Sequence, residues 1–485
     1  MKIKTKILSV FFLFLTSVLL SQQSRLDQLG GLSYSIVDID SQIDPYNFGG
    51  NPAWLVNSKL LQRLDITPSF KNTIGDYHRY YESGDVSNYS ISFMGIKPLG
   101  NSGTFCGFAK YDYDFHKNRN KILTLNPYSG NAFFYTDTTS GDYKYSGPTF
   151  EFIHSLEVFN NFYFGASVNY QILDGLKKVY TFAETLYRNV SANVGIAYKI
   201  SNNLTLGVSY QIFDIQERIT SSDVNNRTVQ TFLFRGETYN IELRGSSQNY
   251  KLKKFENSLS FQTQYKFDEN LVFGINANYL LNNLKSMFPL SSIIDVEDGY
   301  TSQENINIII QSRWLYNNLL TTGFTGGYNN NKSWSKNSKH NLTIWDINLS
   351  SIFAGIGLTY YNKSNGFLLG AEYELHSVEA DSNKFIDNKF SKINAFNHIV
   401  KVGLETSLSD LFVLRIGYNF IYKEHDFIYG GNNVLSHFIT FGGKMKFSEI
   451  TEIEPRIEYE NTILSTRKLN KNNFGIFITF RFYKF

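Results

Sequence analysis

The sequence predicts an all-β fold, a transmembrane antiparallel up-and-down β-barrel of about 18 strands, within a range of roughly 14 to 18. Three observations predict it. Apolar and polar residues alternate with a period of two from about residue 60 to the end of the chain, short and long connections follow each other in turn, and aromatic residues make up 16% of the sequence.

The alternation is clearest in residues 162–172. Phe162 and Val168 fall on one face with the other apolar residues, whereas Ser167 and Asn169 fall on the opposite face. In a barrel the apolar face meets lipid and the polar face lines the lumen. A soluble sandwich also alternates, so the connections decide between the two folds. The same register recurs in residues 204–212 and 258–265.

The connections between alternating segments are short and long in turn, which is the pattern of bacterial outer-membrane barrels. An even number of strands then places both chain termini on the short-turn, periplasmic side. The short polar turns lie near residues 100–102, 159–161, 201–203, 268–270, 316–318, 362–366, 409–410 and 448–449. The longer segments, expected as loops, include residues 118–145, 218–254, 285–303, 329–341 and 379–394.

The composition fits strands at a membrane interface. The chain holds 33 Tyr and 42 Phe against 8 Pro and 4 Met. After residue 21 no apolar stretch approaches the roughly 20 residues that a spanning helix needs. Cys106 is the only cysteine, so no disulfide forms within the chain, and stability has to come from barrel closure and hydrogen bonding.

Three regions follow from the N-terminal sequence. Residues 1–21, with Lys2, Lys4 and Lys6 before an apolar run, form an expected signal peptide that is too short for a membrane anchor. Its removal lowers the formal charge of +3 by three lysines, to zero, which argues against a nucleic-acid partner. The other expected regions are an N-terminal periplasmic or plug segment at 22–58 and the transmembrane barrel at 59–485.

The plug segment does not alternate and contains a compact turn. Two glycines permit unusual backbone angles and an Asn-Pro pair favours a turn, so this element is expected to enter the lumen or to cap its periplasmic mouth. The alternative is a turn that only anchors the segment. The expected plug element consists of Gly49, Gly50, Asn51, Pro52, Ala53 and Trp54.

At Asn51, Pro52 and Ala53 the chain resembles the FadL-like superfamily of outer-membrane transporters, which includes barrels associated with type IX secretion. Those proteins open with an Asn-Pro-Ala element that packs within the barrel before the first strand. The resemblance implies transport of hydrophobic or amphipathic compounds. The chain departs from the family in its higher strand count, against about 14, and in Trp54, where a small residue is usual.

Four strands begin with a similar pattern, namely a turn, an outward apolar strand and a lumen-facing glycine. All strands of a barrel follow the same alternation of apolar and polar residues, so we expect that this rule, and not duplication, explains the similarity. The pattern occurs at residues 161–170, 203–212, 270–279 and 366–375.

Charged residues of the C-terminal half share the face opposite the apolar residues. A Lys or Arg facing lipid at the bilayer midplane costs about 2 to 4 kcal/mol, so these charges are expected to face the lumen. Two interpretations remain open: the charges brace the lumen, or they line a conduction path or solute site. Pro455, which lacks a ladder donor, marks either a bulge or a local opening between strands. The expected lumen charge network is Glu372, Glu374, Lys401, Glu405, Arg415, Glu452, Glu454, Arg456 and Glu458.

The sequence contains no catalytic or metal-binding motif. The eight histidines are scattered, and HExxH and GxSxG are absent, so we expect no enzyme, no cofactor and no metal site. The terminal Phe485 resembles the signal read by the barrel assembly machinery during biogenesis. The expected partners are therefore outer-membrane lipid and this assembly machinery. Nucleic acid is not an expected partner.

The expected location is the outer membrane of a diderm bacterium, after removal of the signal peptide. The expected function is transport or capture of small amphipathic or hydrophobic solutes. The alternative is a non-transporting interaction platform for surface or secretion-system proteins, since the long segments combine exposed aromatic and amide residues. A solute-sized path would favour transport, and a closed lumen under ordered loops would favour the platform.

Overall fold

The computed structural model describes residues 32, 50–57, 62–100, 103–178, 181–223, 228–268, 270–289, 295–317, 319–362 and 364–483. Several features expected from the sequence lie outside these residues: the signal peptide, Gly49 of the plug element, most of the plug segment and the terminal Phe485.

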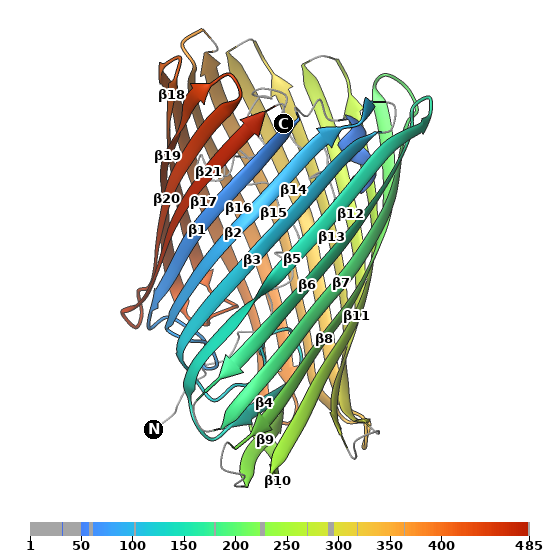
Figure 1. The fold of residues 1–485 in the computed structure, drawn as a ribbon, viewed down its shortest axis with the longest axis vertical. Helices are drawn as coiled ribbons and strands as arrows, with labels where there is room; N and C mark the ends of the chain where they lie inside the picture. The colour runs from blue at the N-terminus through green and yellow to red at the C-terminus, as the bar shows by residue number, and fades with distance from the viewer. Residues whose placement is uncertain are drawn as a thin grey trace.

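Eighteen strands form one closed antiparallel barrel (Figure 1), which confirms the predicted fold class and strand number. Each barrel strand pairs with the next one along the chain, and β1 pairs with β21 to close the cylinder. The barrel strands are β1 (Arg63–Gly75), β2 (Asp85–Pro98), β3 (Thr104–Arg119), β5 (Gly141–Phe159), β6 (Phe162–Lys177), β7 (Phe182–Lys199), β8 (Leu204–Ser222), β11 (Ser247–Lys266), β12 (Leu271–Pro289), β13 (Asp295–Leu315), β14 (Leu320–Asn337), β15 (Thr343–Asn362), β16 (Phe367–Lys384), β17 (Lys389–Ser409), β18 (Phe412–His425), β19 (Asn432–Ser448), β20 (Thr451–Leu464) and β21 (Leu469–Tyr483).

The eight expected short turns join barrel strands at one end of the cylinder. The same end carries the start of β1 at Arg63 and the end of β21 at Tyr483, as an even strand number requires. We call it the inner end and the opposite end the outer end.

The strands continue further toward the outer end than the sequence suggested. β13 and β17 each contain 21 residues. Residues 285–303, 329–341 and 379–394, expected as loops, are largely strand, so that expectation was wrong. These segments place polar residues such as Lys285, Lys332 and Asp381 on the outward face, which hides the alternation. An antiparallel ladder needs only backbone hydrogen bonds, so it continues beyond the lipid.

Outward-facing side chains form an apolar band around the cylinder. Phe261 of β11, for example, is 44% exposed on the outer surface. Toward the inner end the band finishes in aromatic pairs such as Phe159 and Phe162, whose ring centroids are 4.6 Å apart. Toward the outer end it finishes where tyrosine hydroxyls reach polar neighbours, as from Tyr210 to Asn257 at 2.6 Å. The ten or so strand residues between these limits cover about 25 Å along the barrel axis, the height of a hydrocarbon band.

A second, three-stranded sheet packs against the inner surface of the outer end (Figure 1). It contains β4 (Phe133–Asp137), β9 (Val229–Arg235) and β10 (Tyr239–Gly245) in the order β10-β9-β4, and we call it the lid sheet. The expectation of loops at 118–145 and 218–254 was therefore incomplete, because each segment contributes to this sheet.

The largest apolar cluster of buried residues in the described part of the chain lies between the lid sheet and the barrel wall. Tyr135 of β4 stacks on Tyr250 of β11 at 4.8 Å, and Leu233 of β9 is buried in the same cluster. Among the described residues, the only helical segment is the 3-10 helix η3 (Pro52–Asn57). No helix among the described residues is long and apolar enough to cross a membrane.

Candidate functional site

The described part of the plug element lies against the inner surface of the barrel wall near the inner end. Asn51 is fully buried. Its Nδ2 donates to the backbone carbonyls of Ile196 at 3.1 Å and Val208 at 3.3 Å. It also donates to Oε1 of Gln262 at 3.0 Å. The Oδ1 of Asn51 accepts from the amide of Ala53 at 2.9 Å, an Asx turn that begins η3.

Three glycines on adjoining strands make room for this element. A Cβ added at Gly165 would lie 2.4 Å from the backbone nitrogen of Ala53, and one at Gly195 would lie 2.0 Å from Oδ1 of Asn51. A side chain at these positions would displace the element from the wall. The three glycines are Gly165 of β6, Gly195 of β7 and Gly207 of β8.

A second described piece of the N-terminal region contacts a different part of the wall. Leu32 is fully buried, and a Cβ at Gly370 of β16 would lie 2.7 Å from its Cδ1. η3 contacts β5 to β8 instead. In the order of strands around the barrel, β16 is separated from β8 by five strands. The N-terminal region therefore touches two well-separated sides of the lumen at the inner end.

Charged side chains gather on the inward faces of the strands at the inner end. Nε of Arg415 lies 2.8 Å from Glu405, and its Nη1 lies 3.3 Å from Glu454. Arg481 pairs with the same Glu454 at 3.2 Å and with Asp65 at 2.9 Å. These five groups join β17, β18, β20, β21 and β1 in one chain of ion pairs.

The remaining predicted lumen charges are paired as well. Lys401 lies 2.6 Å from Glu374 and 3.8 Å from Glu372. Arg456 lies 3.1 Å from Glu458. Glu452 lies 3.5 Å from Lys444. The structure thus brings all nine predicted charges into ion pairs, and it separates them into neighbouring groups along the wall.

Asp65, Arg481 and Arg63, which lies 3.5 Å from Asp65, are network members that sequence reasoning missed. Asp65 and Arg481 obey the alternation, since Asp65 stands between Leu64 and Ile66 and Arg481 between Phe480 and Phe482. The signal was therefore present. The barrel closure that brings the first and last strands together is what joins them to the other charges.

A buried ion pair fixes the lid sheet to one side of the barrel. Lys177 at the outer end of β6 pairs with Asp137 of β4, and their side chains are 1% and 0% exposed. Asp137 also accepts from the backbone amide of Thr181 at 3.1 Å. Lys177 donates in addition to the carbonyl of Thr139 at 2.8 Å.

The far side of the lid sheet is bound to the opposite part of the wall. Asp387, between β16 and β17, accepts from the backbone amides of Glu237 at 2.7 Å and Thr238 at 2.9 Å in the β9–β10 turn. The segment before β4 reaches across in the same way, because Ser333 of β14 donates to the carbonyl of Gly130 at 3.0 Å. The lid sheet and its flanking segments therefore cross the outer mouth.

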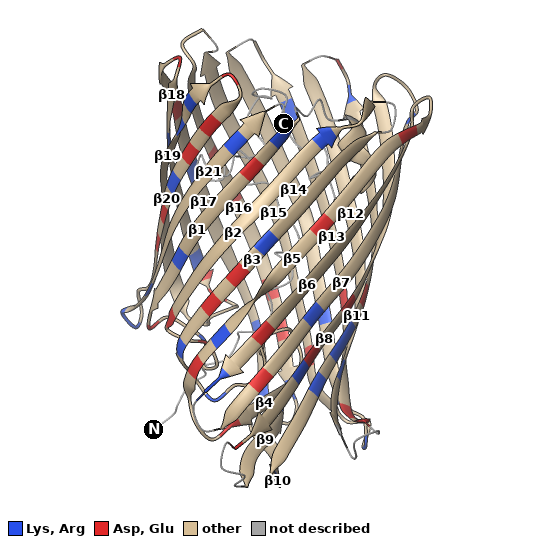
Figure 2. Cartoon of the chain, in the orientation of Figure 1, with Lys and Arg blue, Asp and Glu red and all other residues tan. Residues whose placement is uncertain are grey.

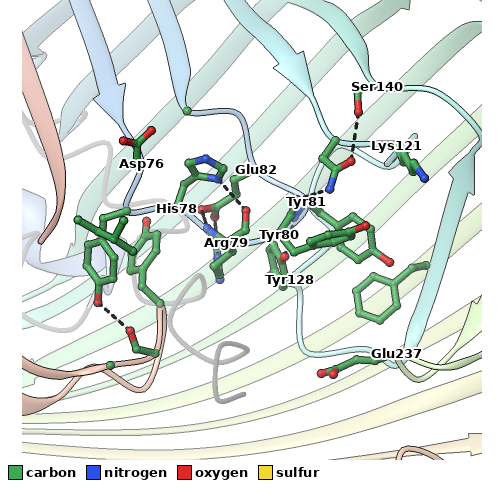
Figure 3. A pocket seen from close by; sticks show the side chains of 18 of the residues that line it. Asp76, His78, Arg79, Tyr80, Tyr81, Glu82, Lys121, Tyr128, Ser140 and Glu237 are labelled. Atoms are coloured by element: carbon green, nitrogen blue, oxygen red, sulfur yellow. Dashed lines mark hydrogen bonds and ion pairs between the residues drawn. The ribbon is translucent and has the colours of Figure 1, made fainter. Parts of the chain in front are cut away.

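Beside the lid sheet, at the outer end, lies a cavity of about 1910 Å³ (Figure 3). Connections β1–β2, β3–β5, β18–β19 and β20–β21 contribute to its lining, together with β4 and β9. Polar side chains around it include amides and both signs of charge. Its aromatic lining residues include Tyr77, Tyr80, Tyr81, Tyr128, Phe134, Trp345 and Tyr429.

Arg79 is the central cation of the cavity wall. Its guanidinium lies 4.0 Å from the ring centroid of Tyr128 and 5.3 Å from that of Tyr429, and it pairs with Glu82. Figure 3 shows Arg79 and Tyr128 side by side in the lining. Burial raises the pKa of Tyr128, so its hydroxyl stays neutral and accepts from the amide of Tyr81 at 2.9 Å.

Two further cations of the lining are available to a ligand. Lys121 and Arg467 are exposed and line the cavity. Neither side chain has an ion-pair partner among the residues that the structure describes. Aromatic faces next to such cations suit solutes that combine an apolar ring with an anionic group.

The wall is interrupted at Pro455, where the sequence allowed a bulge or an opening. In the pairing of β19 with β20, Gly442 faces Arg456 and the next paired residues are Met445 and Ile453. The positions between them are unpaired, and the register is the same on both sides of this gap. The interruption is therefore a local loss of pairing and not a bulge. Ladder bonds are missing because proline has no N–H to donate.

A matching interruption occurs at Pro68 of β1. In the pairing of β1 with β21, Thr67 and Pro68 have no partners. The residue of β21 that would face Pro68 is Ile478, and Ile478 pairs with Pro455 of β20 on its other side. Beside it, the Phe477 ring lies 4.3 Å from the Arg456 guanidinium and 5.1 Å from Nζ of Lys71. One aromatic ring between two cations thus lies at the height where the wall is interrupted twice.

No group of three or more His, Cys, Asp or Glu side chains among the described residues is placed to hold a metal ion. The lumen charges instead neutralise one another.

Solved structures similar to the chain include several outer-membrane barrels. The Pseudomonas putida toluene transporter TodX is 10% identical, with a TM-score of 0.36 and coverage of 95% of this chain and 96% of that one. A FadL homologue of Pseudomonas aeruginosa is 10% identical, with a TM-score of 0.34 and coverage of 90% and 94%. The FrpB iron transporter of Neisseria meningitidis is 10% identical, with a TM-score of 0.42 and coverage of 91% and 83%.

One of these neighbours is itself described as a FadL homologue. At these identities and TM-scores, function has to be inferred from the chain's own residues. No curated protein matches the chain. One family model does, over residues 52–332, which is more than half of the chain. The chain belongs to this family, described as a family of unknown function, DUF6850.

Proposed function

We propose that the chain is an outer-membrane β-barrel protein that captures small amphipathic solutes at its outer cavity and passes them inward. The observation that carries the proposal is the cavity of about 1910 Å³ at the outer end, lined by aromatic rings and exposed cations. Ligand pockets usually enclose about 300 to 1,000 Å³, so this volume admits a small solute together with water. An apolar ring with an anionic substituent is the solute chemistry that fits the lining best.

The lumen below the cavity supports passage in steps. Phe477, which is largely buried beside Lys71 and Arg456, marks a second aromatic and cationic position between the cavity and the inner end. Residues 50–57 rest on one side of the inner end and have to move, or be passed, before a solute leaves. The ladder interruptions at Pro68 and Pro455 offer a sideways exit toward the bilayer as the alternative route.

The test is uptake by proteoliposomes containing the mature protein. An arene sulfonate, a neutral arene of the same size and a disaccharide serve as the three solutes. We expect fastest protein-dependent uptake for the arene sulfonate, and a several-fold loss in the double variant Lys121→Gln, Arg467→Gln. The matched control is Lys332→Gln with Lys392→Gln, which removes two cations outside the cavity. Equal uptake by both double variants, or preference for the disaccharide, would contradict the proposal.

A second candidate function is the interaction platform. The observation in its favour is the lid sheet, which crosses the outer mouth and presents β10 as its edge strand. Tyr239 at the start of this strand is 50% exposed. The platform predicts that shortening the β9–β10 hairpin abolishes binding of a surface protein and leaves solute uptake unchanged. If shortening the hairpin also lowers solute uptake, the result would favour solute capture over the platform.

A further inference from the structure

Four cations stand together on the outer surface of β8, β11 and β12, beyond the apolar band. Arg218 lies directly opposite Lys251, and Lys253 lies directly opposite Lys285. All four share the outward face of their strands with lipid-facing residues such as Phe261. Figure 2 shows the basic residues of β8 and β11 as neighbouring blue bands near the outer ends of the strands. We call these four residues the basic patch.

The pairing of like charges distinguishes this patch from the rest of the outer surface. Opposite charges face each other elsewhere beyond the apolar band, as Glu304 with Lys332 and Asp381 with Lys392. Like charges in directly opposite positions destabilise an antiparallel pair. The patch therefore carries a cost in the isolated protein that an external anion would relieve.

Neighbouring acids neutralise only part of the patch. Lys251 lies 3.2 Å from Asp295, and Lys285 lies 2.8 Å from Glu297. Arg218 and Lys253 have no ion-pair partner among the residues that the structure describes. Arg218 is also exposed. Two cations on adjoining strands thus remain for a ligand.

The height of the patch indicates the source of that ligand. Asn257 of β11, which accepts from Tyr210, stands at the outer limit of the apolar band. Lys253 lies four residues further along the same strand, about 13 Å at the usual rise per residue and less along the barrel axis because the strands tilt. Long basic side chains reach back toward the interface from such positions. The cations are therefore at the height of lipid headgroups.

We propose that the basic patch binds phosphate groups of a phosphorylated lipid in the outer leaflet of the membrane. Arg218 and Lys253 supply charge-assisted hydrogen bonds to phosphate oxygens, and Lys251 and Lys285 add to the local positive potential. The bound lipid offsets the repulsion between facing cations and fixes the orientation of β8, β11 and β12, the strands next to the lid sheet. This inference rests on the placement of the barrel in a membrane and not on the identity of the transported solute.

The test compares lipid binding by two double variants of the full-length mature barrel in neutral detergent. The probes are bisphosphorylated lipid A, the same lipid without phosphates, and inorganic phosphate as a competitor. Each cation near a phosphate contributes roughly a fivefold change in affinity, so Arg218→Gln with Lys253→Gln is expected to weaken binding of the phosphorylated lipid about 25-fold. Lys332→Gln with Lys392→Gln, which removes the same net charge from paired positions, is expected to leave it within about twofold.

A stability measurement gives an independent reading of the same variants. Without lipid, Arg218→Gln with Lys253→Gln is expected to raise the thermal midpoint, because repulsion is relieved. Addition of phosphorylated lipid is expected to raise the thermal midpoint of the wild-type protein more than that of this variant. Equal weakening by the two double variants, or equal binding of the dephosphorylated lipid, would overturn the proposal. Full displacement by millimolar inorganic phosphate would assign the patch to free phosphate and overturn the lipid source.

Discussion

At the scale of single residues, Asn51 and Gly195 decide whether residues 50–57 rest on the wall. The Asn51 amide contacts two backbone carbonyls and Gln262, and this is only feasible because position 195 has no side chain. Gly195→Ala places a Cβ 2.0 Å from Oδ1 of Asn51, so the element is expected to lose these contacts. The strain of such overpacking is about 1 to 3 kcal/mol. We expect larger single-channel conductance in planar bilayers than for the wild-type protein.

The control for this prediction is Gly95→Ala. Position 95 is also a glycine of the barrel wall, and nothing lies within 4 Å of an added Cβ there. Its conductance should match that of the wild-type protein. If Gly195→Ala also leaves the conductance unchanged, residues 50–57 do not restrict the inner end.

We expect Asp426 to make the outer cavity sensitive to acid. Burial disfavours its charged form, but Lys423 and the backbone amides of Tyr429 and Ile428 outweigh burial and hold the pKa of Asp426 below its ordinary 3.8. A carboxyl group whose pKa is lowered by folding stabilises the fold above the unfolded pKa, and this contribution is lost as pH falls through the folded pKa. The turn that presents Tyr429 to the cavity should therefore loosen below about pH 4.

The measurement is the affinity for an arene sulfonate, which stays ionised throughout this pH range. Affinity should be constant from neutral pH to about pH 5 and fall below pH 4. Asp426→Asn should bind weakly at neutral pH and show little further change on acidification. An acid-induced loss of the same size in Asp426→Asn would assign the effect to another group.

At the scale of elements, the lid sheet depends on the buried pair of Lys177 and Asp137. Lys177→Met leaves Asp137 buried without its cation, which costs about 3 to 5 kcal/mol for a buried pair. We expect faster amide hydrogen exchange in β4 and β9 than in the wild-type protein, with the barrel strands unaffected. The double variant Lys177→Met, Asp137→Leu should recover much of the protection, because no buried charge remains.

An exposed pair provides the comparison for the lid sheet. Lys392 and Glu379 are 64% and 50% exposed, so Lys392→Met should change stability by less than about 1 kcal/mol and leave exchange in β4 as it was. Protection of β4 that survives Lys177→Met would mean that its apolar contacts alone hold the lid sheet.

The elements differ in how well the sequence predicts them. Alternation predicts the barrel and its short turns because each wall residue meets either lipid or lumen, as Phe162 and Ser167 do. The same alternation led to the nine expected lumen charges, which lie in ion pairs in the structure. It does not predict the lid sheet, because β4 is only five residues long and all five are buried, so no polar face interrupts it. The outer cavity depends on Arg79, Tyr128 and Tyr429, which come together from three separate connections, and their meeting is invisible to local patterns.

At the scale of the whole molecule, the charge network lies where the barrel closes. Arg481 of the last strand bonds Asp65 of the first strand across 416 residues of sequence, and Glu454 links Arg481 to Arg415 of β18. The ladder of β1 and β21 is interrupted nearby at Pro68, so these side chains support the closure where backbone bonds are missing. Bringing together ends so far apart in sequence is entropically costly, and a contact that forms only on closure compensates for part of that cost.

Removal of Arg481 should therefore weaken closure of the cylinder. Arg481→Met leaves Asp65 and Glu454 with reduced compensation in a buried setting, and we expect a loss of about 3 to 5 kcal/mol. The measurement is the folded fraction against temperature, followed in neutral detergent by the difference in electrophoretic mobility between folded and unfolded barrels. Arg481→Lys should retain part of the stability, because lysine keeps the positive charge. It should not retain all of it, because an ammonium group lacks the planar guanidinium that contacts Asp65 and Glu454 at once. If Arg481→Met unfolds at the wild-type temperature, backbone pairing alone closes the barrel, and the lumen charges are then free to serve the passage of solutes.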